Sequence, residues 1–319
     1  MKANIQTVTG VIQSGQLGHC QFHEHILLSK GISYQRNSAL CMDSYEKSLK
    51  ELKCYIGQGG RTIVDAQPVG CNRMTEELRD ISRESGVQII ASTGFHKMEF
   101  YPPGHWIFEY SEEQIRNVFV SELQSGMYID AEFGEPNKAI PVKAGLIKTA
   151  LDSQGLTEQY KKLFNAAVYA CQRTDRPVMI HTDTGTDPIL LFEYLAQREI
   201  PGEKMVFCHL DRTCKDISIH KELCKRGAYL EYDTIGRQKY HSDEAEAEIF
   251  LDMLRSGYED RILFSLDTTA QRLRAYNPNG VGLDYIIKTF IPLLVRYGAT
   301  EKQIRKISHI NCGRVFESG

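Results

Sequence analysis

Five side chains of types that bind metal ions stand at the ends of short apolar segments. His23 and His25 lie two residues apart in HEH, and the others are His181, His209 and Asp267. Side chains two apart in a strand point to the same face, so the first two imidazoles can share one ion. Histidine with carboxylate suits Zn²⁺, Mn²⁺, Fe²⁺ or Co²⁺, and this set exceeds the ligands of one tetrahedral zinc. The residues therefore predict two divalent metal ions, with Zn²⁺ preferred.

A sixth candidate, Lys148, ends the apolar segment AGLIKTA. A charged amine is costly in such a setting, which favours the neutral form. A neutral lysine can add carbon dioxide, and the resulting carbamate is a carboxylate that can bridge two cations. Taken alone, Lys148 would be interpreted as a lysine whose amine reaches water. Lys143 is a nearby alternative for the bridge, but it precedes the segment.

Eight short segments rich in β-branched and apolar residues position these side chains. They span 19–25, 62–67, 87–94, 144–150, 177–183, 205–211, 228–234 and 261–267. Near-continuous apolar strands are typical of parallel sheets that are buried on both faces. The metal-ligand candidates stand at the ends of their segments, and barrel active sites are built at the carboxyl ends of the strands.

Segments of helical character follow most of these strands. They span 44–58, 74–85, 111–126, 156–172, 188–198, 218–227, 243–257 and 282–298, and several begin at Ser, Thr or Asp and end near Gly. Eight alternations predict an α/β fold, a (β/α)8 TIM barrel, in a single domain over 1–319. The alternative, an open doubly wound sheet, usually carries a glycine-rich phosphate turn that this chain lacks. The longest connection, 95–143, is expected to form a lid or a substrate wall.

Composition excludes several classes of protein. The chain has 319 residues, 42% of them hydrophobic, and its 38 basic and 41 acidic side chains leave a net charge of -3. This balance argues against disorder and against nucleic-acid binding. The absence of a long apolar run argues against a membrane span or signal segment. Nine irregularly spaced cysteines without a CxxC pair favour reduced thiols and a cytoplasmic protein.

In these motifs the sequence resembles the phosphotriesterase family of the amidohydrolase superfamily. The family's pattern is HxH after strand one, a carboxylated lysine after strand four, single histidines after strands five and six, and an aspartate after strand eight. Here the pattern stands as HEH, AGLIKTA, MIHTDTG, FCHLD and LFSLD, with TIVDAQPVG and ASTGF from strands two and three. The motifs occur in order over nearly the whole chain.

The resemblance implies a metal-dependent hydrolase. The more buried cation would be held by His23, His25 and Asp267 and the more exposed one by His181 and His209, with carboxylated Lys148 and a hydroxide as bridges. Asp267 is the implied catalytic residue, which would accept the proton of the hydroxide and deliver it to the leaving group. The family's habit also implies a homodimer.

The resemblance leaves the substrate open, because the family contains organophosphate hydrolases, lactonases and other esterases and amidases. His96 and Lys97 replace the aromatic residue after strand three, and Thr234 replaces the His or Arg that would follow Asp233. Both departures weaken assignment to phosphotriesterases and acyl-homoserine lactonases. Basic and aromatic loop residues could clamp an anionic group of the substrate, or they could simply face water. The predicted substrate-binding residues are His96, Lys97, Tyr101, Arg237, Lys239, Tyr240, Arg272, Arg274 and Tyr276.

Three other features have weaker interpretations. Trp106 could wall a pocket or pin its loop. Asp65 could support the ligands or form hydrogen bonds within the barrel. The acidic run DEAEAE (243–248) is expected to be the solvent-facing first turn of a helix, without a function.

Two hypotheses from different classes follow. In the first, the protein is a metal-dependent hydrolase of a small lactone, with a phosphorylated sugar lactone as one candidate, and an organophosphate triester or another ester or amide as alternatives. In the second, it is a metal-containing binding protein that has lost catalysis. A binding protein needs no proton acceptor, so a complete ligand set with Asp267 favours the enzyme.

Overall fold

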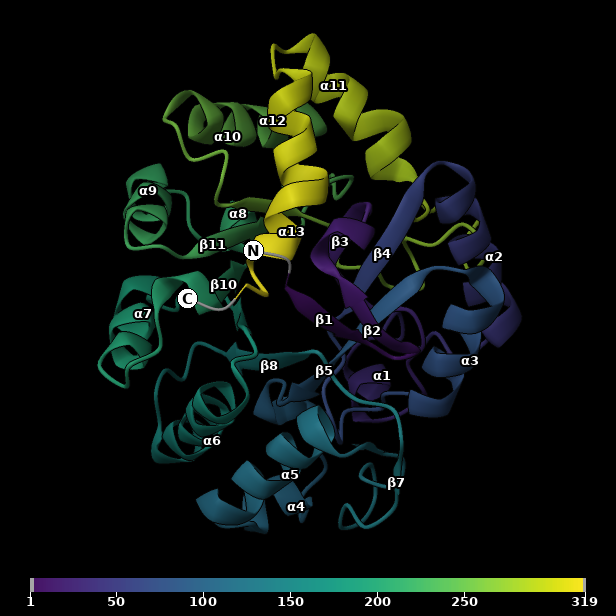
Figure 1. Cartoon of the computed structure of the whole chain (residues 1–319), viewed down its shortest axis with the longest axis vertical. Coiled ribbons are helices and arrows are strands. Elements are labelled where there is room, and N and C mark those ends of the chain that lie inside the picture. The colour runs from purple at the N-terminus through teal and green to yellow at the C-terminus, as the bar shows by residue number, and fades with distance from the viewer. Residues whose placement is uncertain (1–2, 318–319) are drawn as a thin grey trace.

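The computed structural model describes residues 3–317, which form a barrel of eight parallel strands surrounded by helices (Figure 1). The strands are β3 (His19–Glu24), β4 (Gly60–Asp65), β5 (Gln88–Gly94), β8 (Leu146–Leu151), β9 (Val178–Thr182), β10 (Met205–Cys208), β11 (Tyr229–Tyr232) and β12 (Ile262–Phe264). Each pairs in parallel with the next one along the chain. All eight coincide with the expected segments, so the predicted (β/α)8 fold is confirmed.

Contacts between the first and last strands nearly close the barrel. The Asp267 amide, just beyond β12, donates to the His23 carbonyl oxygen at 3.0 Å. The Leu266 amide donates to Glu24 Oε1 at 2.8 Å. Closure therefore brings two predicted metal ligands together from opposite ends of the chain.

The strands alternate their side chains between two apolar layers. A smaller cluster, which includes Leu146 and Met179, fills the barrel interior, and a larger cluster lies between the sheet and the helices. Lys148 and His181 stand two residues after these interior side chains, so each continues the inward face to the carboxyl end of its strand.

A register irregularity in β3 accompanies the inward direction of His23. Phe22 belongs to the interior cluster, yet His23, the next residue, lies against Lys148 in the same interior. The pairing of β3 with β4 shifts between Gln21 and Glu24. Such a bulge changes the direction of the side chains that follow it, so the expected shared face of the HEH motif depends on this local irregularity.

Helices surround the barrel on its outside and at its ends. They are α1 (Ile32–Arg36), α2 (Tyr45–Gly57), α3 (Thr75–Ser85), α4 (Trp106–Glu109), α5 (Glu112–Gln124), α6 (Glu158–Thr174), α7 (Pro188–Ala196), α8 (Leu210–Thr213), α9 (Ile217–Lys225), α10 (Asp243–Arg255), α11 (Ile291–Arg296), α12 (Glu301–Arg305) and α13 (Asn311–Arg314). Short 3₁₀ turns are η1 (Ser14–Gln16), η2 (Met98–Phe100) and η3 (Gly202–Lys204). Side-chain caps begin several of the expected helices; for example, Ser111 accepts from the Gln114 amide at the start of α5.

The last expected helix, 282–298, differs from the prediction. It begins with π-helical turns, η4 (Ile286–Phe290), and becomes α-helical only in α11. Pro292 explains the wider turns, because proline lacks the amide hydrogen and its ring clashes with the carbonyl one turn earlier.

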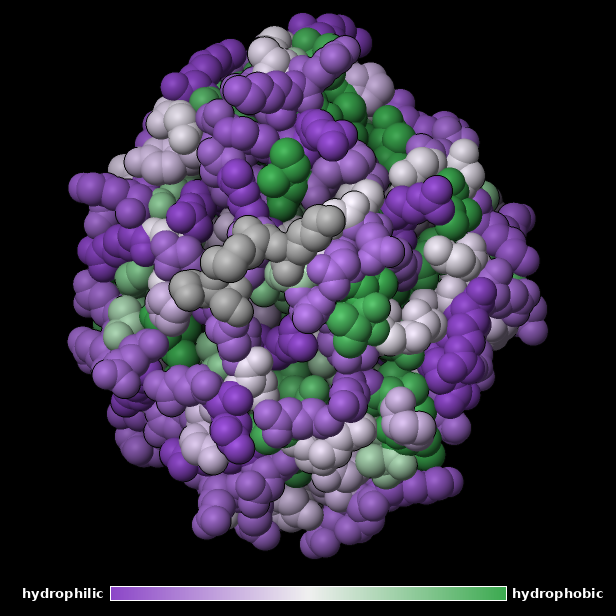
Figure 2. All heavy atoms as spheres, in the orientation of Figure 1, coloured by the Kyte–Doolittle hydropathy of each residue, from purple (hydrophilic) through white to green (hydrophobic). Residues whose placement is uncertain are grey.

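Elements at both chain ends cover the amino-terminal end of the strands. They are the hairpin β1 (Asn4–Thr7) and β2 (Gly10–Gln13), together with α12, η5 (Lys306–Ile310) and α13; Figure 1 shows the hairpin and α13 near the centre of the view and α12 above them. Phe316 packs against Phe22 within the interior cluster. None of these elements was expected from the sequence. Figure 2 shows the same face as mostly hydrophilic, with its hydrophobic atoms in separate small groups.

The connection 95–143 is not a plain loop. It contains η2, α4, the barrel helix α5, and a short hairpin of β6 (Met127–Tyr128) and β7 (Ala139–Ile140). All nine cysteines are unpaired. In the part of the chain that the structure describes, no helix is both long and apolar enough to cross a bilayer.

Candidate metal centre

The structure brings all six predicted metal ligands together at the carboxyl ends of the strands. The first group is His23, His25 and Asp267, whose ligand atoms all lie within 4.8 Å of one another. Asp267 Oδ1 lies 3.8 Å from His23 Nε2 and 3.6 Å from His25 Nε2. Two imidazoles and a carboxylate form a donor set suited to Zn²⁺ and similar ions.

His181 and His209 form the second group. Nδ1 of His181 lies 2.7 Å from Nε2 of His209. The rings of His23 and His209 are 4.9 Å apart, which joins the two groups. His209 and Asp267 both have positive φ angles, of 70° and 49°. This backbone conformation is strained for residues other than glycine and is common at functional sites.

Lys148 lies between the groups with its side chain fully buried. Its Nζ is 3.2 Å from His23 Nε2 and 3.5 Å from Met179 Sδ, and no carboxylate forms an ion pair with it in the described residues. Burial therefore lowers the pKa of the amine. A buried amine with a reduced pKa is suited to carboxylation, whereas Lys143 is only half-buried and precedes β8.

Burial favours the neutral form of three imidazoles of the centre, those of His23, His181 and His209. Burial lowers the pKa of His181 to about 4 and lowers the pKa values of His23 and His209 well below the usual range. A neutral imidazole keeps a lone pair for a metal ion. The ligand types, their convergence and their charge state thus all fit divalent cations.

Buried carboxylates that the sequence reasoning did not assign to the centre lie behind the imidazoles. Glu231 Oε2 is 3.3 Å from His23 Nδ1, and Asp233 Oδ2 is 2.5 Å from His209 Nδ1. Carboxylates at the far nitrogen orient metal-binding imidazoles and strengthen their basicity. Glu231 lies in β11 and Asp233 just after it, so their two-residue spacing in EYD could have revealed that both point inward.

Asp183 has the same relation to His181. Its Oδ1 lies 2.8 Å from His181 Nε2, which leaves Nδ1 of that ring directed at His209. Lys97, a predicted substrate-binding residue, donates to Asp183 Oδ2 at 3.0 Å. The two-residue spacing of His181 and Asp183 in IHTD could have indicated this contact from the sequence.

The predicted proton acceptor, Asp267, is bound by two guanidinium groups. Oδ2 of Asp267 lies 3.1 Å from both Arg212 Nη1 and Arg237 Nη2. Although burial favours the neutral acid, the Arg237 charge, the hydrogen bond with His25 and the Arg212 charge together hold the pKa of Asp267 well below its usual range. Asp267 is therefore ionised at neutral pH. Arg212 was not predicted, although it follows His209 in the HLDR motif.

Arg272 is buried beside Arg237 and donates to the Ile235 carbonyl oxygen. Burial and the neighbouring Arg237 charge lower its pKa to about 9. The Nε atoms of both arginines are buried without a hydrogen-bond partner in the described residues. Two predicted substrate-binding residues thus form a pair of like charges with unused donors.

The other predicted residues after strand three lie on the opposite side of the centre. The ring of His96 is buried 5.2 Å from the ring of His181. The Tyr101 hydroxyl accepts from the His96 amide at 2.8 Å, and its side chain is buried. Tyr101 therefore supports His96 from behind.

Lys239 and Tyr240 are exposed on the loop after β11. They line a cavity of about 690 Å³ together with Arg212. Lys239 Nζ lies 4.6 Å from the centre of the Tyr240 ring. Both residues thus lie at the rim, and the side chain of Arg212 lies between them and Asp267.

Arg274 and Tyr276 are engaged in other contacts. Arg274 donates to the Val281 carbonyl oxygen and pairs with Asp284. The Tyr276 hydroxyl donates to the Ser44 carbonyl oxygen at 2.8 Å. These contacts connect loop segments, and neither side chain contacts a ligand of the centre.

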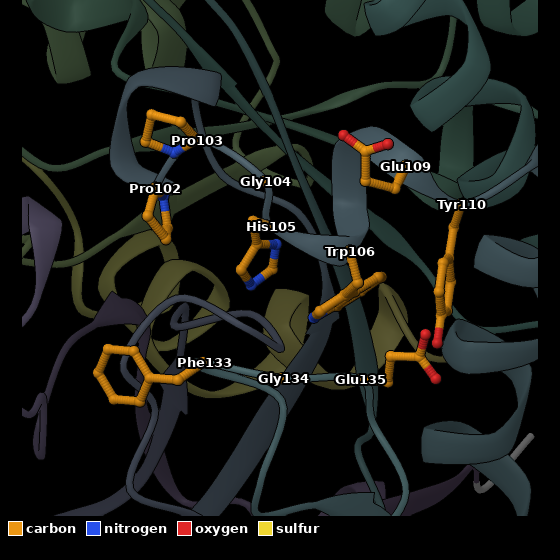
Figure 3. Close-up of a pocket in the computed structure, with 10 residues that line it drawn as sticks. All are labelled: Pro102, Pro103, Gly104, His105, Trp106, Glu109, Tyr110, Phe133, Gly134 and Glu135. Atoms are coloured by element: carbon orange, nitrogen blue, oxygen red, sulfur yellow. The ribbon is translucent and has the colours of Figure 1, made fainter.

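Trp106 lines a separate cavity of about 280 Å³, drawn in Figure 3. The figure shows its indole between His105 and Tyr110, above Gly134 and Glu135. Its Nε1 donates to the Ala131 carbonyl oxygen at 2.8 Å. No predicted metal ligand lines this cavity, so the contact of Trp106 is with its own loop.

Asp65 accepts from the Ile26 and Gln67 amides at 3.0 and 3.1 Å, which is hydrogen bonding at the barrel end.

The acidic run 243–248 does begin α10, but the expectation that it faces solvent is wrong for Asp243 and Glu246, which are buried. Asp243 accepts from the Tyr285 hydroxyl at 2.6 Å, a contact that only the folded chain creates.

Comparisons with known proteins agree with this arrangement. The model of the phosphotriesterase family matches residues 3–316. The chain is 28% identical to an N-acetyltaurine hydrolase from Danio rerio, with 96% of each chain covered, and 28% identical to a phospho-furanose lactonase from Mycoplasmopsis synoviae, with 98% of this chain and 91% of that protein covered. The crystal structure of a lactonase from Listeria monocytogenes is 29% identical over 99% of both chains, with a TM-score of 0.89. This protein is therefore a hydrolase enzyme and belongs to the phosphotriesterase family.

Proposed function

We propose that this enzyme hydrolyses a small lactone that carries a phosphate group, in particular a phosphorylated sugar lactone. The observation that carries the proposal is the pair formed by Arg237, which contacts Asp267, and the neighbouring Arg272. The buried Nε atoms of Arg237 and Arg272 have no hydrogen-bond partner among the described residues. Buried donors without a partner are costly, and planar guanidinium groups match phosphate oxygens, so a phosphate on the substrate would satisfy both Nε atoms.

Arg237 of the arginine pair lies next to Asp267, the proposed proton acceptor. Arg237 Nη2 lies 3.1 Å from Asp267 Oδ2, so an anion held by this pair would anchor the substrate next to that carboxylate. Anchoring a non-reacting group lowers the entropic cost of aligning the reacting one. Exposed Lys239 would add a third cation at the rim.

The donor set supports two divalent cations, with Zn²⁺ preferred and Mn²⁺, Co²⁺ or Fe²⁺ as alternatives. The residues that would hold them are His23, His25 and Asp267 for one, His181 and His209 for the other, and carboxylated Lys148 between the two. When bound, the cations would polarise the lactone carbonyl and supply hydroxide at neutral pH.

Asp267 would accept a proton during the reaction and then donate it. Hydrolysis joins the oxygen of water to the carbonyl carbon, breaks the bond from that carbon to the ring oxygen, and transfers one proton to the ring oxygen. The ionised Asp267 carboxylate would accept this proton from the attacking water and deliver it to the leaving oxygen. Arg212 and Arg237 keep the carboxylate in the ionised form that this role requires.

The relatives favour a lactone over a triester, because two of them are named lactonases and one of these is a phospho-furanose lactonase. N-acetyltaurine hydrolase supports a second candidate. N-acetyltaurine is an amide that carries a sulfonate, and the same arginine pair could bind that anion. In both cases the anionic group is recognised by Arg237 and Arg272, and the bond that is broken differs.

A substrate panel tests the proposal. The metal-loaded enzyme is assayed with a phosphorylated sugar lactone, the same lactone without phosphate, an acyl-homoserine lactone, a phosphotriester and N-acetyltaurine. We expect kcat/KM for the phosphorylated lactone to exceed that for its unphosphorylated form at least ~100-fold, because two charge-assisted hydrogen bonds from one guanidinium alone contribute about 1.5 kcal/mol each. Equal values for the two lactones would contradict the proposal, and a faster reaction with N-acetyltaurine would replace it with the second candidate.

A further inference from the structure

Outside the candidate metal centre, Asp211, His241 and Glu246 form a second cluster of metal-ligating side chains. Asp211 lies in α8, His241 in the loop after β11, and Glu246 in the first turn of α10. One ligand atom of each lies within 4.8 Å of the other two. We propose that this cluster binds a divalent transition-metal ion at a site distinct from the barrel centre.

The hydrogen bonding of His241 directs a lone pair into the cluster. Its Nδ1 lies 3.3 Å from the Ser242 carbonyl oxygen. A carbonyl can only accept, so Nδ1 carries the hydrogen and Nε2 is free to bind a metal ion. Nε2 lies 3.1 Å from Glu246 Oε2, but the two atoms are not aligned as a hydrogen bond. This arrangement, with one nitrogen on a carbonyl and the other on the ligand side, is common for metal-binding histidines.

The carboxylates supply unpartnered oxygens. Both Glu246 oxygens and Asp211 Oδ1 are buried without a hydrogen-bond partner among residues 3–317. Glu246 is fully buried and Asp211 is 6% exposed. Two adjacent buried carboxylates repel each other unless a positive charge lies between them. A divalent cation would neutralise both and use the three free ligand atoms at once.

The second Asp211 oxygen already has partners, which separates it from the free one. Oδ2 accepts from the Asp233 amide at 2.9 Å and from the Thr234 amide at 2.6 Å. Asp211 is therefore held in place by the backbone after β11, with Oδ1 left for a ligand. A metal ion would join the ends of β10 and β11 to α10.

The donor set selects the class of ion, and the cavity provides a route to it. One imidazole and two carboxylates suit Mn²⁺ or Zn²⁺, whereas Mg²⁺ and Ca²⁺ prefer oxygen ligands alone. Asp211 and His241 line the cavity of about 690 Å³ that also borders Lys239 and Tyr240. An ion can thus enter from the rim without passing through the barrel centre.

The site would have a structural effect on substrate binding. The loop between Thr234 and His241 carries Arg237, one of the two arginines proposed to bind the substrate anion. A cation that fixes His241 to α10 would reduce the freedom of this loop. The metal site itself does not depend on the proposed reaction, because it is argued from Asp211, His241 and Glu246 alone.

Anomalous diffraction with Mn²⁺ tests the site directly. Crystals of the full chain soaked in Mn²⁺ should show an anomalous peak among Asp211, His241 and Glu246. The peak should disappear in Glu246→Gln, which has nearly the same shape, and remain in Glu248→Gln, a variant of an exposed residue on the same helix. The metal content in solution should fall by one equivalent per chain in Glu246→Gln only.

Two outcomes would overturn the proposal. One is a Mn²⁺ peak at the barrel centre with none at the cluster, which would indicate that a proton or an ion pair of His241 and Glu246 neutralises the carboxylates. The other is equal metal content in Glu246→Gln and the wild type. If Glu246→Gln does not fold, His241→Asn at a half-buried position gives the same comparison. Because activity is not measured, failure of the lactonase proposal leaves this result unaffected.

Discussion

Replacement of Arg272 by lysine should selectively impair the reaction with a phosphorylated substrate. Lysine keeps a positive charge but cannot present two parallel N–H groups to a phosphate. The change removes the buried Nε donor that has no partner among the described residues, together with one Nη donor. It also removes the bond from Arg272 to the Ile235 carbonyl oxygen, which disturbs the neighbouring loop for every substrate. The informative quantity is therefore the ratio of the kcat/KM value for the phosphorylated lactone to that for the unphosphorylated lactone.

The size of the effect follows from the hydrogen bonds that are lost. Two charge-assisted bonds of about 1.5 kcal/mol each amount to ~3 kcal/mol, or a kcat/KM lower by roughly 100-fold for the phosphorylated lactone. The general disturbance of the loop lowers kcat/KM for both substrates. The ratio of kcat/KM with phosphate to that without should therefore fall by nearly the same roughly 100-fold factor. Inhibition by inorganic phosphate should weaken in parallel.

Steady-state kinetics on both lactones provide the assay, and Arg274→Met is the matched control. Arg274 lies on the same loop, but its guanidinium pairs with Asp284 and bonds to the Val281 carbonyl oxygen. We expect the control to leave the substrate ratio unchanged. An unchanged ratio in Arg272→Lys, or equal falls in both variants, would refute the assignment of the arginine pair to the phosphate.

Three further predictions concern the centre and the barrel. Asp267→Asn should lower kcat by ~100- to 10,000-fold in stopped assays because it removes the proposed proton acceptor; a loss below tenfold would exclude that role. Lys148→Met should abolish hydrolysis but leave the midpoint of urea unfolding of the metal-free protein unchanged or higher, since a buried amine with few partners is replaced by an apolar side chain of similar length; a large loss of stability would show that the amine is structural. Burial lowers the pKa of His19 to about 3, below the value in the unfolded chain, so its stabilising contribution is complete above pH 6.5 and is lost as the pH falls toward 3. His19→Gln should therefore flatten the fall in unfolding free energy between pH 7 and pH 5, and an identical slope in both proteins would contradict this explanation.

The barrel and the convergence of the ligands were predictable because both depend on local patterns. Parallel strands place their carboxyl ends at one rim, so a polar residue at the end of each apolar segment must meet the others there. Lys148 and His181 follow from the alternation of side chains along their strands. His23 shows the limit of this reasoning, because the bulge in β3 decides its direction and is not visible in the HEH motif.

The partners of loop residues were not predictable in the same way. Arg272 and Arg274 are two residues apart, yet one lies beside Arg237 and the other pairs with Asp284. The acidic run 243–248 predicts a solvent-facing helix turn, but Asp243 and Glu246 within it are buried in the folded chain. A charged side chain in a loop can point to water or to a partner at little difference in cost, so only the surroundings decide.

The amino-acid sequence by itself determined the eight strands, their order, the (β/α)8 fold and the types of the candidate metal ligands, because hydrophobic periodicity acts between near neighbours in the chain. The tertiary structure alone decided which charges meet. It placed Arg212 and Arg237 on Asp267 and put Glu246 against His241 and Asp211. The energy of a buried charge depends on every element packed around it, and those elements come from distant parts of the chain.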